Sequence, residues 1–311
     1  MKAGPSSTIP SHASRRCSET HPACRWGSSF LLIKVAVEAF SPLQIVFGRV
    51  LLGAAVLLVL VAASGLRLAS EASTWKQLTV MGTVSNIIPF ALITWGEQRI
   101  TSGLAAILNS TTPLFTATIA AMFLPGETLK ATRVAGIALG FVGVAVIVGV
   151  GAEGGEAVGQ LAVVAASLSY GVGFVYARHR LTGRTLSPLE LSAGQLVAAS
   201  ALALPLAALD TVVHEPAFTP IATIAVAALG MLGTGIAYTL YYRLVQDVGP
   251  TSASFVTYLL PIFGVALGRL VLDERLGWNT ALGALLVIAG IVLAERAGRA
   301  PRAPVVVRRV G

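Results

Sequence analysis

Long apolar runs dominate this chain, and the short stretches between them carry most of its charged residues. Nine of the runs are about 20 residues long, the length at which a helix crosses the roughly 30 Å hydrocarbon layer of a membrane. A shorter apolar run at residues 26–40 precedes them. The pattern predicts an all-α membrane protein with ten transmembrane helices and no separate soluble domain. The nine long helices are expected at residues 43–64, 77–96, 101–124, 132–152, 158–177, 187–209, 219–242, 251–272 and 277–295.

Small motifs within these runs occur twice, in the same order. The Ser-Pro-Leu sequence of residues 41–43 returns at residues 187–189, and the Pro-x-Phe sequence of residues 113–115 returns at residues 261–263. Such internal similarity indicates repeated structural units. Each predicted unit has five helices, so the second unit enters the membrane from the opposite side. Inverted repeats of this kind are common in secondary transporters.

The predicted organisation therefore has four parts. A polar, basic N-terminal tail covers residues 1–25, the first repeat residues 26–152, the second repeat residues 158–297, and a basic tail residues 298–311.

Basic residues indicate the orientation of the chain, because cytoplasmic loops of membrane proteins carry an excess of Lys and Arg. If the N-terminus is cytoplasmic, only Lys34, Arg99 and Arg275 lie at or near the outer side. Abundant Arg, Ala and Gly are typical of a GC-rich bacterial genome. We therefore predict a multi-pass protein of a bacterial inner membrane with both termini in the cytoplasm. The basic residues assigned to the cytoplasmic side are Lys2, Arg15, Arg16, Arg25, Arg67, Lys76, Lys130, Arg133, Arg178, Arg180, Arg184, Arg243, Arg296, Arg299, Arg302, Arg308 and Arg309.

Composition excludes most other classes of protein. Hydrophobic residues make up 55% of the chain and charged residues 12%, whereas a soluble domain has about 25% charged residues. The net charge of +8 belongs to membrane loops, so we expect no nucleic-acid partner. Cys17, Cys24 and four scattered histidines lack metal-ligand spacing. No nucleotide-binding or catalytic motif is present, so we expect no cofactor, no metal and no enzymatic activity.

The ordered set of motifs resembles the EamA-type branch of the drug/metabolite transporter superfamily across residues 26–297. The motifs are the Trp-Gly-Ser-Ser-Phe of residues 26–30, Arg49 early in the second helix, the two Pro-x-Phe sequences, the acidic joints at residues 126–127 and 273–274, and glycines in the fifth and tenth helices. The resemblance implies ten helices in two inverted repeats and the transport of small metabolites. Members of this family usually have a further apolar segment before the tryptophan, so we interpret helix 1 as truncated.

Two prolines and one arginine are the leading candidates for function. Pro113 and Pro261 each remove a backbone hydrogen bond inside a predicted helix, and they are expected to line or hinge the substrate path, or else to be simple packing kinks. Arg49 is expected to bind an anion or carboxylate, to pair with Glu38 or Glu97, or to extend to the lipid headgroups.

Polar and aromatic residues complete the candidate substrate pathway. Their alternative roles are packing between helices or contact with the membrane interface. Lys34 and Glu38 are spaced to pair with each other on helix 1, and the glycine-bearing helices 5 and 10 are expected to be scaffold. The full candidate set is Trp26, Ser29, Arg49, Asn86, Trp95, Asn109, Thr112, Pro113, Tyr170, Phe174, Tyr238, Tyr258 and Pro261.

We expect a secondary transporter, more specifically an exporter, that moves small metabolites, amino-acid-like compounds or drugs by alternating access. Its expected partners are the lipid bilayer and a small-molecule substrate, and a homodimer through helices 5 and 10 stays open. A non-transporting sensor and a lipid scramblase are the alternatives. A membrane-embedded lipid enzyme would need converging acid–base groups, which the sequence does not show.

Overall fold

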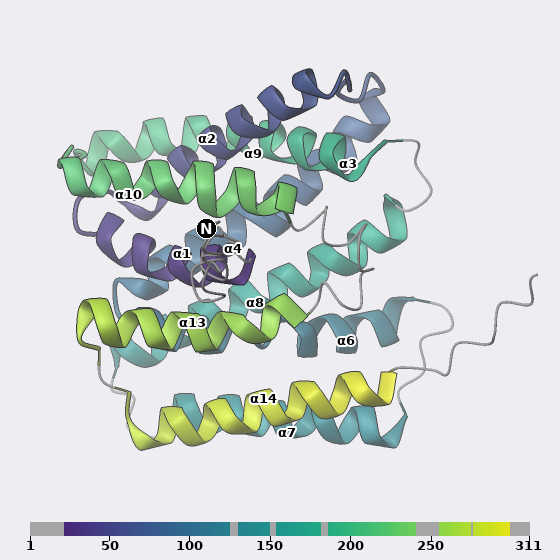
Figure 1. Cartoon of the computed structure of the whole chain (residues 1–311), viewed down its shortest axis with the longest axis vertical. Helices are drawn as coiled ribbons and strands as arrows, with labels where there is room; N and C mark the ends of the chain where they lie inside the picture. Colours follow the sequence, from purple (N-terminus) through teal and green to yellow (C-terminus); the bar gives the residue numbers. More distant parts are fainter. Residues whose placement is uncertain are drawn as a thin grey trace, which may run out of the picture.

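Helices account for all regular structure in the described part of the chain. A computed structural model describes residues 22–124, 130–149, 154–181, 186–240, 255–274 and 276–298, and no strand occurs within these ranges. The helices lie roughly parallel to one another (Figure 1). This confirms the prediction of an all-α protein.

The first half of the chain forms the helices α1 to α7, and one span is interrupted by a π-helical segment. Their bounds are α1 (Pro22–Ala36), α2 (Pro42–Ala63), α3 (Ala72–Gly82), η1 (Thr83–Ile87), α4 (Ile88–Glu97), α5 (Ser102–Asn109), α6 (Thr112–Phe123) and α7 (Ala131–Gly149). The second half has a similar series. It consists of α8 (Gly155–Arg180), α9 (Pro188–Val213), α10 (Pro220–Gly230), η2 (Met231–Ile236), α13 (Phe255–Leu272) and α14 (Trp278–Gly298).

The repeated Ser-Pro-Leu sequence is the start of a helix in both places. The Ser41 hydroxyl accepts a hydrogen bond from the Gln44 backbone N–H, and the Gln44 side chain accepts one from the Ser41 N–H. Ser187 and Glu190 form the same reciprocal box at the start of α9. Such a box satisfies two N–H groups that a helix start leaves unpaired, and proline fits the next position because it has no N–H to satisfy.

Seven helical segments of the described residues are long and apolar enough to cross a membrane. Pro261–Leu272 and Trp278–Ala294 form two shorter apolar helices. Large apolar side chains such as Phe123 and Leu209 are about two-thirds exposed on the outside of the bundle, a surface that suits lipid better than water. The protein is therefore a multi-pass membrane protein. The seven segments are Pro42–Ala63, Ala72–Glu97, Ser102–Phe123, Ala131–Gly149, Gly155–Arg180, Pro188–Val213 and Pro220–Leu240.

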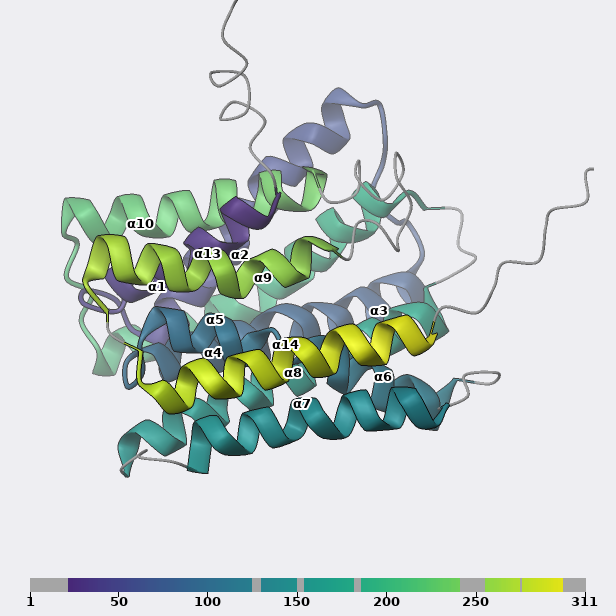
Figure 2. The same cartoon turned by 60° about the horizontal axis from the view of Figure 1, so that its bottom comes forward.

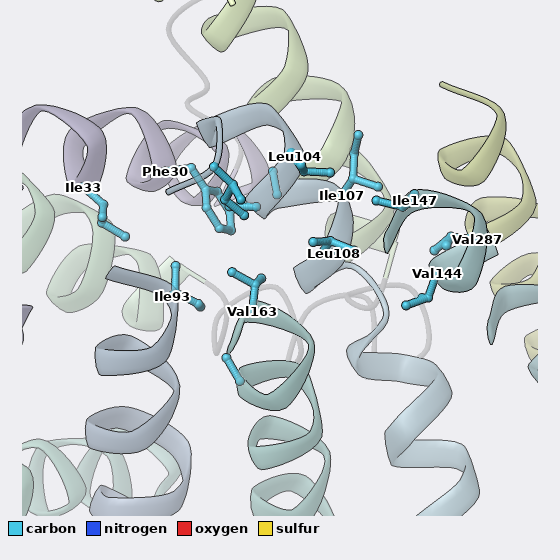
Figure 3. Packing of buried hydrophobic residues seen from close by; sticks show 14 of the residues in the cluster. Phe30, Ile33, Ile93, Leu104, Ile107, Leu108, Val144, Ile147, Val163 and Val287 are labelled. Atoms are coloured by element: carbon cyan, nitrogen blue, oxygen red, sulfur yellow. The ribbon is translucent and has the colours of Figure 1, made fainter. Parts of the chain in front are cut away.

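A buried apolar cluster joins the centre of the bundle. Figure 3 shows Ile93 of α4, Val163 of α8 and Leu108 of α5 pointing towards one another, with Phe30 and Leu104 beside them. These side chains are at most 5% exposed. Their contacts hold α1, α4, α5 and α8 together, and these helices frame the polar residues described below.

Lys34 makes a different contact from the predicted one. Its ammonium group donates to the backbone carbonyls of Glu97, at 2.6 Å, and Ile100, at 2.9 Å, while Glu38 is exposed. The predicted pair of Lys34 with Glu38 is therefore wrong. The physical reason is that the carbonyl of Glu97, the last residue of α4, lacks a partner within its own helix and lies at the negative end of the helix dipole, while Ile100 adds a carbonyl from the turn that follows.

Helices α7 and α14 pack along a glycine seam, which we define as Gly136, Gly143, Gly283 and Gly290. In both views they lie together along one edge, away from α10 (Figures 1 and 2). A Cβ atom at Gly136 would lie 2.7 Å from the Gly290 carbonyl oxygen, and one at Gly143 would lie 2.7 Å from the Gly283 oxygen. Only glycine allows the two backbones to come this close.

Contacts between the two halves occur in exchanged pairs. Helix α1 packs against α13 as α8 packs against α6, and α3 packs against α9 as α10 packs against α2. Helix α2 packs against α9, and α7 packs against α14.

Candidate functional site

Two π-helical segments interrupt two of the spans. Segment η1 joins α3 to α4, and η2 follows α10. Single π-helical turns within α-helices are frequent at functional sites. Asn86 lies in η1 and Thr234 in η2, and both side chains are fully buried.

Glycines at the start of the π-segments bring them against α2 and α9. A Cβ atom at Gly82 would lie 2.9 Å from the Gln195 carbonyl oxygen, and one at Gly230 would lie 3.0 Å from the Arg49 carbonyl oxygen. Gln195 is the residue that the Ser-Pro-Leu repeat aligns with Arg49. The two contacts therefore involve corresponding positions in the two halves of the chain. The contact at Gly230 also places η2 beside Arg49.

Arg49 points into the bundle and is only 8% exposed. Its Nε donates to the Thr234 hydroxyl at 2.9 Å, and its guanidinium carbon lies 3.7 Å from the centre of the Phe90 ring. This is a cation–π contact. The side chain does not extend to the headgroups, and Glu38 is exposed and does not pair with it.

Aromatic and amide groups surround this guanidinium. The Tyr238 hydroxyl donates to the Asn86 side-chain oxygen at 3.3 Å, and the Asn86 nitrogen has no partner among the described residues. Tyr170 packs edge-on against Phe90, with ring centres 6.4 Å apart. Tyr170 and Tyr238 also lie close enough to Arg49 to interact with its charge. The site therefore unites residues from α2, η1, α4, α8 and the span containing η2.

We call this group the Arg49 cluster. It consists of Arg49, Asn86, Phe90, Tyr170, Thr234 and Tyr238. Ser29 lies at its edge, because a Cβ atom at Gly233 would lie 2.9 Å from the Ser29 hydroxyl oxygen.

The structure brings together five of the sequence candidates and leaves others elsewhere. Ser29, Arg49, Asn86, Tyr170 and Tyr238 lie in or beside the Arg49 cluster, whereas Phe174 is 54% exposed on another part of the surface. The side chains of Trp26 and Tyr258 lie outside the described residues.

The predicted break near Pro113 is present, because α5 ends at Asn109 and α6 begins at Thr112. The Thr112 hydroxyl donates back to the Asn109 carbonyl at 2.8 Å, so it satisfies its own backbone. The Asn109 side-chain oxygen is buried without a partner. Pro261, by contrast, lies inside the continuous helix α13.

Thr234 was not predicted from the sequence to belong to the site. Phe90 is one of several aromatic residues in the predicted helices, and only its contact with Arg49 in the structure distinguishes it from the others. A signal for Thr234 was nevertheless present. Thr234 follows Asn86 at the same spacing that separates Pro261 from Pro113. The same spacing relates Tyr238 to Phe90, so comparison of the repeats could have found both pairs.

A separate open pocket of about 680 Å³ lies where the α1–α2 turn meets the ends of α4 and α9. Trp95 lines it, with the Arg99 guanidinium carbon 3.7 Å from a Trp95 ring centre. The Ser41 hydroxyl is hydrogen-bonded to Asp210, whose other oxygen lies 3.0 Å from the His214 ring. These contacts tie the start of α2 to the end of α9.

Comparison with known proteins identifies the family. The model of the EamA-like transporter family matches residues 22–149 and again residues 157–295. A solved crystal structure shares the fold at 22% sequence identity, with a TM-score of 0.63, over 94% of this chain and all of that one.

Several relatives share about a quarter of their residues with this chain. The uncharacterized transporter YoaV of Bacillus subtilis is 24% identical over 271 residues, which are 86% of this chain and 92% of the relative. The inner membrane transporter YedA of Escherichia coli K12 is 27% identical over 86% of both chains. A probable terminal-alkyne amino-acid exporter of Streptantibioticus cattleyicolor is 27% identical over 87% of this chain and 90% of that one. The chain is accordingly a membrane transporter and not an enzyme, and it belongs to the EamA-like transporter family.

Proposed function

We propose that this protein is a secondary transporter that exports small amino-acid-like compounds across a bacterial inner membrane by alternating access. The observation that carries the proposal is the Arg49 cluster, a buried polar site formed by residues from both halves of the chain. A polar site at depth in a membrane bundle is costly unless it serves a function. Its position between the two halves is where a transporter binds its substrate.

The exchanged contacts between the halves support ten helices in two inverted five-helix repeats. Corresponding positions of the two halves make corresponding contacts. Gly82 packs against Gln195, and Gly230 packs against Arg49. In this arrangement the halves rock against each other and expose the cluster to one side at a time. The glycine seam then acts as outer support.

The loop charges support an orientation with both termini in the cytoplasm. The α1–α2 turn then faces outwards, and the pocket beside Trp95 and Arg99 is the outer mouth of the path. Ser41, Asp210 and His214 close the bundle at that end. The amino-acid class of substrate is supported by the printed name of the Streptantibioticus relative.

Counterflow in proteoliposomes tests this function. Vesicles containing the purified chain and loaded with an unlabelled amino acid should accumulate the labelled compound above its equilibrium level, because only an alternating carrier exchanges the two. Vesicles without protein are the control. Binding without counterflow would indicate a sensor, and movement of fluorescent lipid between leaflets instead would indicate a scramblase.

A further inference from the structure

The positive charge of Arg49 has no carboxylate partner among the described residues. Its guanidinium lies between Thr234 and Phe90, neither of which is charged. The two terminal nitrogens, Nη1 and Nη2, donate no hydrogen bond within the described part of the chain. A buried charge is strongly disfavoured unless it is paired. The described residues therefore leave the positive charge of Arg49 unbalanced.

Glu97 does not serve as the missing counter-ion. Its side chain is fully buried, and neither carboxylate oxygen has a hydrogen-bond partner. The Lys34 ammonium group donates to the Glu97 backbone carbonyl and not to the carboxyl group. No hydrogen bond joins Arg49 to the Glu97 side chain in the described part of the chain. The Glu97 carboxyl group is therefore not bound to the guanidinium of Arg49.

Two further hydrogen-bond donors of the Arg49 cluster are unused within the described part of the chain. The Asn86 side-chain nitrogen is buried without an acceptor, and the Tyr170 hydroxyl makes no hydrogen bond within the described residues. With Nη1 and Nη2 they form a set of donors around a positive charge. Such a set is complementary to an anion, because an ammonium group or a neutral donor would leave these groups unpaired.

The shape of the guanidinium further restricts the anion. Phe90 covers one face of the guanidinium plane, so Nη1 and Nη2 offer their hydrogens at its edge. A planar edge of two donors matches the two oxygens of a carboxylate. The rings of Phe90 and Tyr170 next to it suit an apolar body attached to that carboxylate.

We propose that Arg49 binds the carboxylate of the transported solute, with Asn86 and Tyr170 as additional donors, so that the protein selects organic acids and amino acids over their amides and amines. This inference rests on the proposed transport function and names the group that the central site recognises.

Matched ligands test the selectivity. Counterflow and ligand-induced thermal stabilisation of the purified full chain would be measured with branched-alkyl, terminal-alkyne and phenyl skeletons, each as the acid, amide, amine and sulfonate. We expect acids to be preferred over the amides of the same skeleton by roughly 10- to 100-fold, the loss expected when one charge-assisted hydrogen bond is removed and the amide carbonyl keeps the other. Equal responses to acid and amide, or a preference for amines or sulfonates, would overturn the inference while leaving the transport function intact. If no solute moves, the transport function itself fails and the inference fails with it.

Variants assign the selectivity to Arg49. Arg49→Gln should abolish the preference for acids, and Arg49→Lys should retain part of it because the charge remains while the two-donor edge is lost. Arg269→Gln is the matched control, since Arg269 is exposed and pairs with Asp273. Size-exclusion profiles and melting temperatures check folding. Phe90→Leu offers a second route, because it should weaken binding of the acid several-fold and keep the acid-over-amide ratio. Retention of that ratio in Arg49→Gln would contradict the proposal.

Discussion

The glycine seam and the Arg49 cluster are both places where the two halves of the chain meet, yet they are built in opposite ways. At the seam, α7 and α14 touch through glycine backbones and through apolar side chains such as Ile147 and Leu286. At the cluster, side chains of both halves meet through a hydrogen bond, a cation–π contact and unpaired donors. Close backbone packing has one favourable arrangement, whereas polar side chains can exchange partners. The difference supports the proposed division between a rigid support at the seam and a solute-binding site at the cluster.

The largest expected effect is the loss of transport in Arg49→Gln. Removing the charge and its two terminal donors should reduce counterflow at least about 100-fold, because charge-assisted hydrogen bonds contribute about 1.5–3 kcal/mol each. The melting temperature should change little or rise, since the variant no longer buries an unpaired charge. Counterflow and thermal unfolding of the same sample measure both quantities. Transport close to wild type would remove Arg49 from the substrate path.

The seam should show the reverse behaviour. In Gly290→Leu the new side chain meets the backbone of α7, where a Cβ atom would already lie 2.5 Å from the Gly136 carbonyl oxygen. Overpacking of this kind costs about 1–3 kcal/mol, so the melting temperature and the yield of folded protein should fall. Protein that does fold should keep its solute preference.

Gly149→Ala is the control for the seam, because a Cβ atom there meets nothing within 4 Å. If Gly290→Leu altered selectivity at normal stability, the division between support and site would be wrong.

A smaller effect is expected at the helix starts. Ser41→Ala removes the cap of α2 and also the hydrogen bond to Asp210, whereas Ser187→Ala removes the cap of α9. A lost cap costs about 1 kcal/mol, so both variants should melt at lower temperature. The melting temperature of Ser41→Ala should fall further, because this variant also loses the hydrogen bond to Asp210 in the other half of the chain. Equal losses in thermal unfolding would show that the contact with Asp210 adds no stability.

The smallest expected effect comes from Tyr238→Phe. This change removes the hydroxyl that donates to Asn86 at 3.3 Å and keeps the ring. An ordinary hydrogen bond contributes about 0.5–1.5 kcal/mol, which corresponds to a decrease of roughly 2- to 12-fold in solute affinity. Concentration dependence of counterflow measures it. A decrease as large as that of Arg49→Gln would shift the centre of the site from Arg49 to Tyr238.

The sequence pattern predicted the positions of helices more accurately than the contacts between side chains. The helix expected at residues 43–64 spans Pro42–Ala63, and that expected at residues 187–209 spans Pro188–Val213, because proline and a capping serine define these starts. The π-segments could not be anticipated, since a one-residue change in hydrogen bonding leaves the apolar pattern unaltered. The partner of Lys34 was predicted wrongly, because the spacing between Lys34 and Glu38 contains no information about a distant backbone carbonyl such as that of Glu97.

The sequence by itself determined that this is an all-helical membrane protein whose motifs occur twice, because helix length, apolar content and loop charge are local properties of the chain. It also identified Arg49 as an unusual residue. It did not decide whether Arg49 extends to the lipid headgroups, pairs with Glu38 or Glu97, or binds an anion. Only the tertiary structure decided that Arg49 faces inward, because its partner Thr234 lies 185 residues away. The orientation of a buried charge depends on which distant groups surround it, and folding alone brings those groups together.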